Sequence, residues 1–126
     1  MFQKETIKES VSALPLKSCD YCVITGTALV MHGIKEETKD IDISCTREAF
    51  RALVAQGYPI KQGAFARKVI YSDDVEIFED WHRGDITMIE GVPVASLESV
   101  IVMKKQLGRE KDLSDIAKIE AHLAQR

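Results

Sequence analysis

The chain has 126 residues, with 17 Lys and Arg side chains against 20 Asp and Glu side chains, and a formal net charge of −3. This length suits a single domain, 1–126, with a hydrophobic core of its own. The charge balance argues against tight, sequence-independent binding to long nucleic acid. No apolar run approaches the length of a membrane span, and residues 1–5 do not begin a signal peptide, so we expect a cytoplasmic protein.

The N-terminal segment predicts a helix over residues 4–14. Ile7, Val11 and Leu14 recur there at helical spacing, and Pro15 ends the pattern. We expect this amphipathic helix to pack on a sheet and to carry no chemistry.

Three cysteines suit a reducing compartment, and Cys19 and Cys22 have C-x-x-C spacing. Redox pairs of this type lie at a helix start, whereas this pair runs into a predicted strand. No second pair completes a structural zinc site. We therefore interpret Cys22 and Cys45 as small apolar residues of buried strands.

Residues 21–43 predict a strand, a glycine turn, a short helix and a second strand. Residues 21–25 are apolar and β-branched, and Gly26 can adopt the backbone angles of a sharp exit from a strand. Thr27 then opens a short helix that Gly33 ends. A helix start of this kind can hold a phosphate through its free N–H groups.

Two acids mark the second strand of this segment. Asp40 and Asp42 are two residues apart, so they share one face while Ile41 and Ile43 point into a core. Neighbouring carboxylates repel each other unless a cation lies between them, and Mg²⁺ or Mn²⁺ prefers such oxygen ligands. The alternative is an ordinary solvated strand face.

The remaining elements follow from periodicity and turn residues. We predict a helix over 47–56 capped by Thr46, a loop over 58–63, a hairpin of strands 67–71 and 75–78, a strand at 86–89, a helix over 97–107 capped by Ser96, and a last helix over 112–124.

Glu76, Trp81 and His82 each allow a functional and a structural interpretation. Glu76 faces away from its core-directed neighbours, either as a solvated residue or as a third acid beside Asp40 and Asp42. Trp81 could stack on a nucleobase or be a core or rim residue. His82 could carry a proton, although nothing near it in sequence positions it, and we interpret His32 and His122 as structural.

The segment from Gly26-Thr27 through Asp40-Ile41-Asp42-Ile43 resembles the signature of the nucleotidyltransferase superfamily, whose fold is shared with DNA polymerase β. Thr-Gly-Thr-Ala-Leu and Thr-Lys-Asp-Ile-Asp-Ile resemble its small bacterial branch, which includes members of toxin–antitoxin and abortive-infection systems. Thr27 replaces the second Gly or Ser of the signature, and Lys39 stands where the family often has an apolar residue. The resemblance covers about residues 20–120.

The resemblance implies an α/β fold with a mixed β-sheet of four or five strands and helices mainly on one side. It also implies Mg²⁺- or Mn²⁺-dependent transfer of a nucleoside monophosphate from a nucleoside triphosphate to a hydroxyl acceptor. In that reading Asp40, Asp42 and Glu76 hold the metal, and the backbone around Gly26 and Thr27 holds the β- and γ-phosphates.

The C-terminal part adds a second resemblance, to the Lys-Asp-x-x-Asp-Ile motif of the same bacterial branch. It implies that Lys111 reaches the nucleotide phosphates and that Asp112 orients Lys111 or a neighbour. Lys104, Lys105 and Arg109 precede the motif. The alternative for these cations is complementation of a helix dipole.

A second function from another class remains open. The chain could be a catalytically silent nucleotide-binding module, for example the partner subunit of a toxin–antitoxin pair. A chain of this length has little room for an acceptor domain, so we expect a homodimer or a partner protein to complete the site. The presence of Asp40, Asp42 and Glu76 together favours the enzyme.

Overall fold

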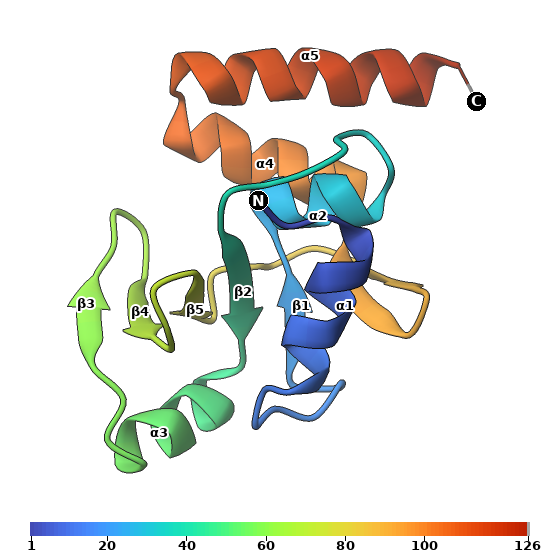
Figure 1. Ribbon diagram of the computed structural model, residues 1–126. Coiled ribbons are helices and arrows are strands. Elements are labelled where there is room, and N and C mark those ends of the chain that lie inside the picture. The colour runs from blue at the N-terminus through green and yellow to red at the C-terminus, as the bar shows by residue number, and fades with distance from the viewer. Residues whose placement is uncertain (126) are drawn as a thin grey trace.

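The computed structural model describes residues 1–125, which form a seven-stranded mixed sheet flanked by five helices (Figure 1). The strands are β1 (Tyr21–Val23), β2 (Ile41–Cys45), β3 (Ile60–Gln62), β4 (Arg67–Ile70), β5 (Val75–Glu79), β6 (Ile86–Ile89) and β7 (Val92–Ala95). The helices are α1 (Lys4–Ser12), α2 (Thr25–Met31), α3 (Arg47–Ala55), α4 (Leu97–Leu107) and α5 (Glu110–Ala124).

The sheet order is β3-β4-β5-β2-β1-β7-β6. β2 runs antiparallel to β1 and parallel to β5, while β1 also pairs in parallel with β7. The sheet is therefore mixed, and the predicted α/β class is confirmed. The number of strands is seven, however, and not the four or five that we expected.

The two strands that we did not predict are β3 and β7, and each was missed for a different reason. β3 lies at one edge of the sheet, and its three side chains are all exposed, so the segment shows no alternation and reads as a loop. Its backbone nevertheless pairs with β4 in register. β7 contains Pro93, which argues against an inner strand. It is tolerated because the short β1 pairs with β7 only at Val94.

The core lies between the sheet and the helices. α2 packs on β2 and β7 and against α4, and α3 packs on β4 and β5. Predicted apolar positions fill this core, and the largest fully buried side chains are Phe50, Ile7, Ile24, Leu29, Met31, Ile41, Ile43, Leu53, Ile77, Leu97, Ile119 and Val23.

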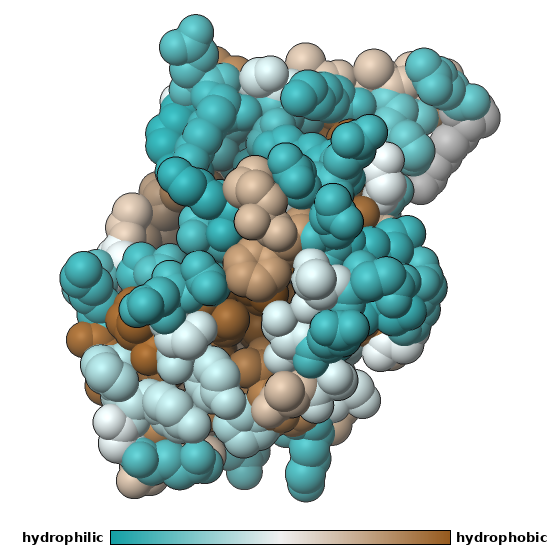
Figure 2. All heavy atoms as spheres, in the orientation of Figure 1, coloured by the Kyte–Doolittle hydropathy of each residue, from teal (hydrophilic) through white to brown (hydrophobic). Residues whose placement is uncertain are grey.

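The two C-terminal helices form a hairpin along one end of the molecule (Figure 1). Ser96 caps α4 by accepting a hydrogen bond from the Ser99 backbone, and Gly108 ends the helix in the left-handed conformation. Mostly hydrophilic side chains cover α5, whereas hydrophobic atoms show near β4 and β5 (Figure 2). Within residues 1–125, every helix is too short or too polar to span a membrane.

Candidate functional site

The predicted acids come together where β2 and β5 begin. Asp42 and Glu76 are register partners on these adjacent parallel strands, so they lie side by side, with the strands about 4.8 Å apart. The residues flanking each acid are buried, which turns both acids toward the opposite face of the sheet. Asp40, just before β2, is exposed and lines the same pocket.

The carboxyl group of Asp42 is partly buried among other negative charges. Burial raises its pKa above the ordinary value, and nearby Glu76 and Asp40 raise the pKa further. Thr25 acts in the opposite direction, because its Oγ1 donates a hydrogen bond of 2.9 Å to Asp42 Oδ2. Lys68 also lowers the pKa of Asp42, but burial and the two neighbouring carboxylates outweigh the hydroxyl and this cation.

The start of α2 differs from our expectation. The helix begins at Thr25, and the residue in the left-handed region is Thr25, with a φ of 49°, and not Gly26. At Gly26 the constraint is space, since a Cβ there would lie 3.0 Å from Thr38 Oγ1 and the Thr38 side chain would have to shift slightly. Thr25 was missed as a site residue because we assigned it to the preceding strand.

Thr27 holds the backbone at both Asp40 and Asp42 through hydrogen bonds. Its fully buried hydroxyl accepts a hydrogen bond from the backbone N–H of Asp42 at 2.9 Å and donates one to the carbonyl of Asp40 at 3.1 Å. This side chain thus fixes the path of the chain through both acids, while Gly26 lies in the pocket wall.

Glu76 has a partner that sequence reasoning missed. Lys68 Nζ lies 2.8 Å from Glu76 Oε2. Lys68 projects from β4, which pairs with β5, and both side chains line the same pocket. The alternation of Lys68 with buried Val69 in the predicted hairpin was an available signal, because it places Lys68 on the face that Glu76 uses.

The acids do not form a ready three-ligand metal centre. Among residues 1–125, no group of three His, Cys, Asp or Glu side chains is placed to hold a metal ion. The donor set still fits a hard divalent cation, since the carboxylates of Asp42 and Glu76 lie side by side and Asp40 lines the same pocket. Glu76 would have to release Lys68 to serve as a ligand.

Two pockets meet at the carboxylates. One, of about 260 Å³, extends from Asp42 and Glu76 toward the aromatic side chains of Phe65, Phe78 and Trp81. The other, of about 270 Å³, extends past Gly26 toward a basic wall that includes Lys39 and Lys35, the latter paired with Asp115. Both are lined by Thr25, Asp40, Asp42, Arg109 and Lys111. The acids therefore lie between an aromatic wall and a basic wall.

The C-terminal motif supplies a buried ion-pair network. Asp112 is 0% exposed and accepts hydrogen bonds from Arg109 Nε at 2.6 Å and from Lys104 Nζ at 3.2 Å. Burial alone would raise the pKa of Asp112, but these bonds outweigh it and lower the pKa to about 2. Lys104 also pairs with Asp115, which Lys35 contacts at 3.0 Å.

The network bears on the predicted roles of Asp112, Lys111 and Lys104. Asp112 holds Arg109, a neighbour of Lys111, and lies outside both pockets. Lys111 is exposed and reaches both pockets from the first turn of α5, which begins two residues earlier than predicted. Lys104 is a buried ion-pair partner and not a surface cation complementing the helix dipole.

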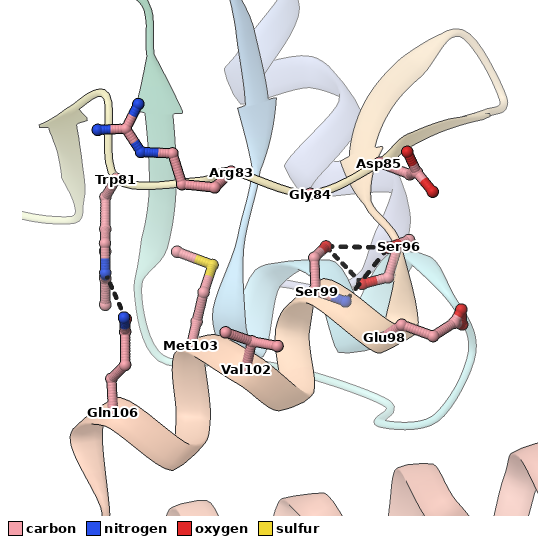
Figure 3. Close-up of a pocket in the computed structure, with 10 residues that line it drawn as sticks. All are labelled: Trp81, Arg83, Gly84, Asp85, Ser96, Glu98, Ser99, Val102, Met103 and Gln106. Carbon is pink, nitrogen blue, oxygen red and sulfur yellow. Dashed lines mark hydrogen bonds between the residues drawn. The ribbon is translucent and has the colours of Figure 1, made fainter.

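A third pocket lies apart from the acids, over α4 (Figure 3). Trp81 forms part of its wall, and the indole donates a hydrogen bond to Gln106. His82 contacts Ser99 Oγ at 2.9 Å, and His32 contacts the carbonyl of Ala95, which fits structural roles. Since this pocket includes none of the predicted acids, it is not the candidate site.

The cysteines take the places that we expected. Cys22 and Cys45 are buried in β1 and β2, and Cys19 is exposed; all three are free thiols. Burial raises the pKa of Cys22 and that of Cys45 to about 12 each, so both stay protonated and unreactive near neutral pH.

Comparison with known proteins bears on the fold. No family model and no curated protein matches the sequence. The structure is similar to the crystal structure of a "putative nucleotidyltransferase" from Thermotoga maritima, with 16% sequence identity and a TM-score of 0.55. The match covers 97% of this chain and 91% of that chain. At this identity the likeness establishes the fold, which is the one that the sequence resemblance implied.

Proposed function

We propose that the protein is a nucleotidyltransferase, which moves a nucleoside monophosphate from a nucleoside triphosphate to a hydroxyl acceptor. One observation carries the proposal. Asp42 and Glu76 stand in register on adjacent strands and line a pocket that also contains cationic side chains. Lys68 neutralises Glu76, but burial and two neighbouring carboxylates raise the pKa of Asp42, an environment that a purely structural carboxylate would not need.

The acids are the proposed ligands of Mg²⁺ or Mn²⁺. Asp40 and Asp42 would hold the ion, joined by Glu76 once it leaves Lys68. When bound, the metal would neutralise phosphate charge and stabilise the charge that develops in the transition state.

The other residues bind and orient the triphosphate. Lys111 and Arg109 lie between the pockets, and Lys35 and Lys39 extend the basic wall toward Gly26. Cations at these positions suit the β- and γ-phosphates, and the missing side chain of Gly26 lets the backbone approach them.

The proposed reaction is an in-line displacement. The acceptor oxygen forms a bond to the α-phosphorus, the bond from that phosphorus to the bridging oxygen breaks, and pyrophosphate leaves. The acceptor proton passes to the carboxylate of Glu76, which lies in the pocket next to Asp42.

Binding is tested first by calorimetry with Mn²⁺ and a non-hydrolysable nucleoside triphosphate. We expect weak binding of Mn²⁺ alone, tighter binding with the nucleotide, and loss of both in Asp40→Ala/Asp42→Ala. The matched control is Asp73→Ala/Asp74→Ala, which removes the same charge from an exposed turn. Equal binding by the wild type and the Asp40→Ala/Asp42→Ala protein would rule out the site.

Transfer is tested by incubation with α-labelled ATP, CTP, GTP or UTP and a cell lysate. Labelled protein, RNA or a small molecule is expected with the wild type and not with Asp40→Ala/Asp42→Ala. Label that appears equally with both proteins would contradict a transferase role for these acids.

The silent-module alternative is supported by one observation. The Lys68–Glu76 ion pair occupies the third acid, which only an enzyme needs for the attacking oxygen. Normal triphosphate binding with no product from any nucleotide or acceptor would favour the module.

The finer family assignment belongs to the same proposal. We place the chain in the small bacterial branch with toxin–antitoxin and abortive-infection members, acting as a homodimer or with a partner protein that completes the acceptor side. Light scattering that shows a monomer with full transfer activity would remove the need for either partner.

A further inference from the structure

The aromatic wall of the candidate site contains a ring pair in which Trp81 packs against the core and Phe65 is half exposed. Phe65 and Trp81 face each other with 6.1 Å between ring centroids and only 11° between ring planes. Both rings line the pocket that contains Asp42 and Glu76. Neither ring belongs to the set of buried core side chains.

Trp81 is held in place from several directions. Its indole Nε1 donates a hydrogen bond of 2.9 Å to Gln106 Oε1 on α4 (Figure 3). Its backbone N–H donates to Ser44 Oγ at 3.1 Å, and its ring packs at a tilt against Phe78, with 5.1 Å between centroids. The indole is thus a fixed surface at the end of the pocket.

Phe65 is placed differently. It lies near the tip of the β3–β4 hairpin, which a hydrogen bond from the Gly63 N–H to the carbonyl of Ala66 closes. Its side chain is 50% exposed, so half of the ring remains accessible to a ligand. A large aromatic residue that a tight turn holds over another ring is better explained by a ligand than by packing.

A planar guest needs more room than the two rings leave. A ring that contacts aromatic faces on both sides needs about 7 Å between those faces, twice the contact distance of carbon atoms. The 6.1 Å between centroids includes any sideways offset of the rings, so their faces are at most 6.1 Å apart. The half-exposed Phe65 side chain would have to move away from Trp81 to admit a ring between them.

We propose that Phe65 and Trp81 form the base-binding subsite of the nucleotide. This inference rests on the proposed function and gives the substrate an orientation. The nucleobase stacks between the two rings, the α-phosphate lies at Asp40 and Asp42, and the terminal phosphates extend to the basic wall at Lys35 and Lys39. Stacking on aromatic faces tolerates any base, so purines and pyrimidines are both expected to bind.

Trp81 is the only tryptophan, so its fluorescence reports directly on this subsite. Titration with ATP or CTP in the presence of Mg²⁺ should quench the emission. Inorganic tripolyphosphate, which has no base, should bind without quenching. Equal quenching by tripolyphosphate and ATP would overturn the stacking assignment.

Substitution of the exposed ring gives an independent test. Phe65→Ala should weaken ATP binding between about 5-fold and 100-fold, the usual range for one lost base–aromatic stack. Tripolyphosphate affinity should stay unchanged, and Phe65→Tyr should restore ATP affinity. The matched control is Met88→Ala, at an exposed apolar side chain on β6. Unchanged or tighter ATP binding by Phe65→Ala would overturn the subsite.

The outcomes separate the two proposals. If calorimetry detects ATP binding but Trp81 emission does not respond, the subsite is wrong and the nucleotide site stands. If neither ATP nor tripolyphosphate binds, the proposed function and the subsite fail together.

Discussion

Two groups of carboxylates in this molecule have opposite environments. Asp42 lies on the sheet next to Glu76, and its pKa is raised by burial and by neighbouring negative charge. Asp112 is more deeply buried on α5, yet its pKa is lowered because Arg109 and Lys104 surround it with positive charge. The same functional group is therefore held in two different electrostatic states within one small fold.

The difference indicates which group is available to a ligand. The charge of Asp112 is neutralised within the protein, so it contributes to the native structure. The charge at Asp42 is left in excess and faces a pocket, so a bound cation would lower the free energy of this site. Arg109 connects the two groups, because it is held by Asp112 and lines the pockets at Asp42.

The largest expected effect comes from removing the charge of Asp112 from its ion pairs. Asp112→Asn should destabilise the protein by about 3 kcal/mol, because it leaves Lys104 buried with one carboxylate fewer. Thermal unfolding measures the change, with Glu120→Gln, exposed on the same helix, as the control. Since the pKa of Asp112 is lowered to about 2, the wild-type advantage should vanish as pH falls from 3.8 toward 2. A pH-independent difference would show that its charge is not the cause.

The next effect concerns Glu76, the acid beside Asp42 that only the transfer reaction requires. Glu76→Gln should reduce nucleotidyl transfer by about 10²-fold or more, the scale for losing a positioned proton acceptor. Triphosphate affinity should stay within a few-fold, because Asp40 and Asp42 remain. Glu76→Asp should keep partial activity. Glu79→Gln is the matched control, since Glu79 is on the same strand but pairs with Arg67 outside the pocket. Wild-type transfer by Glu76→Gln would make Glu76 an ordinary strand residue.

A smaller effect of opposite sign is expected at Asp42. Asp42→Asn should stabilise the ligand-free protein by on the order of 1 kcal/mol at neutral pH, because it removes a charge that is largely buried and lies beside other carboxylates. A raised pKa means that the charge destabilises the folded state only once the carboxyl ionises. The gain in melting temperature should therefore be absent below pH 3.8 and grow as pH rises. Destabilisation at neutral pH would contradict the excess of negative charge.

The smallest effect is expected at the ion pair between the strands. Lys68→Met should change stability by less than about 1 kcal/mol, because both side chains of the pair are partly exposed. It should strengthen Mn²⁺ binding, measured by calorimetry, because Glu76 no longer has a competing cation. Weaker Mn²⁺ binding in this variant would show that Lys68 supports the metal site.

Much of the sheet could be predicted because its pattern is local. The alternation around Asp42 and Glu76 specifies which face each acid uses, and the short turn at 72–74 joins β4 and β5 as predicted. β3 could not be predicted in this way. Its side chains are exposed, so hydrogen bonding to β4, and not burial, makes it a strand.

The electrostatics of the site depend on contacts between distant segments. Lys104 looks like a surface cation at a helix end, and only the packing of α5 on α4 buries it between Asp112 and Asp115. Lys68 meets Glu76 across a strand pairing. Sequence could therefore identify the acids, but not which of them a cation of the protein already neutralises.

The left-handed backbone of Thr25 limits how the protein can be redesigned for stability. A designer would place glycine at such a φ, since a side chain there costs roughly 1–2 kcal/mol. Glycine would also raise the conformational entropy of the unfolded chain, and it would remove the hydroxyl that donates a hydrogen bond to Asp42. At position 25, relief of backbone strain therefore competes with the hydrogen bond that positions Asp42. A variant stabilised by glycine at this position would be expected to hold the Asp42 carboxylate less firmly.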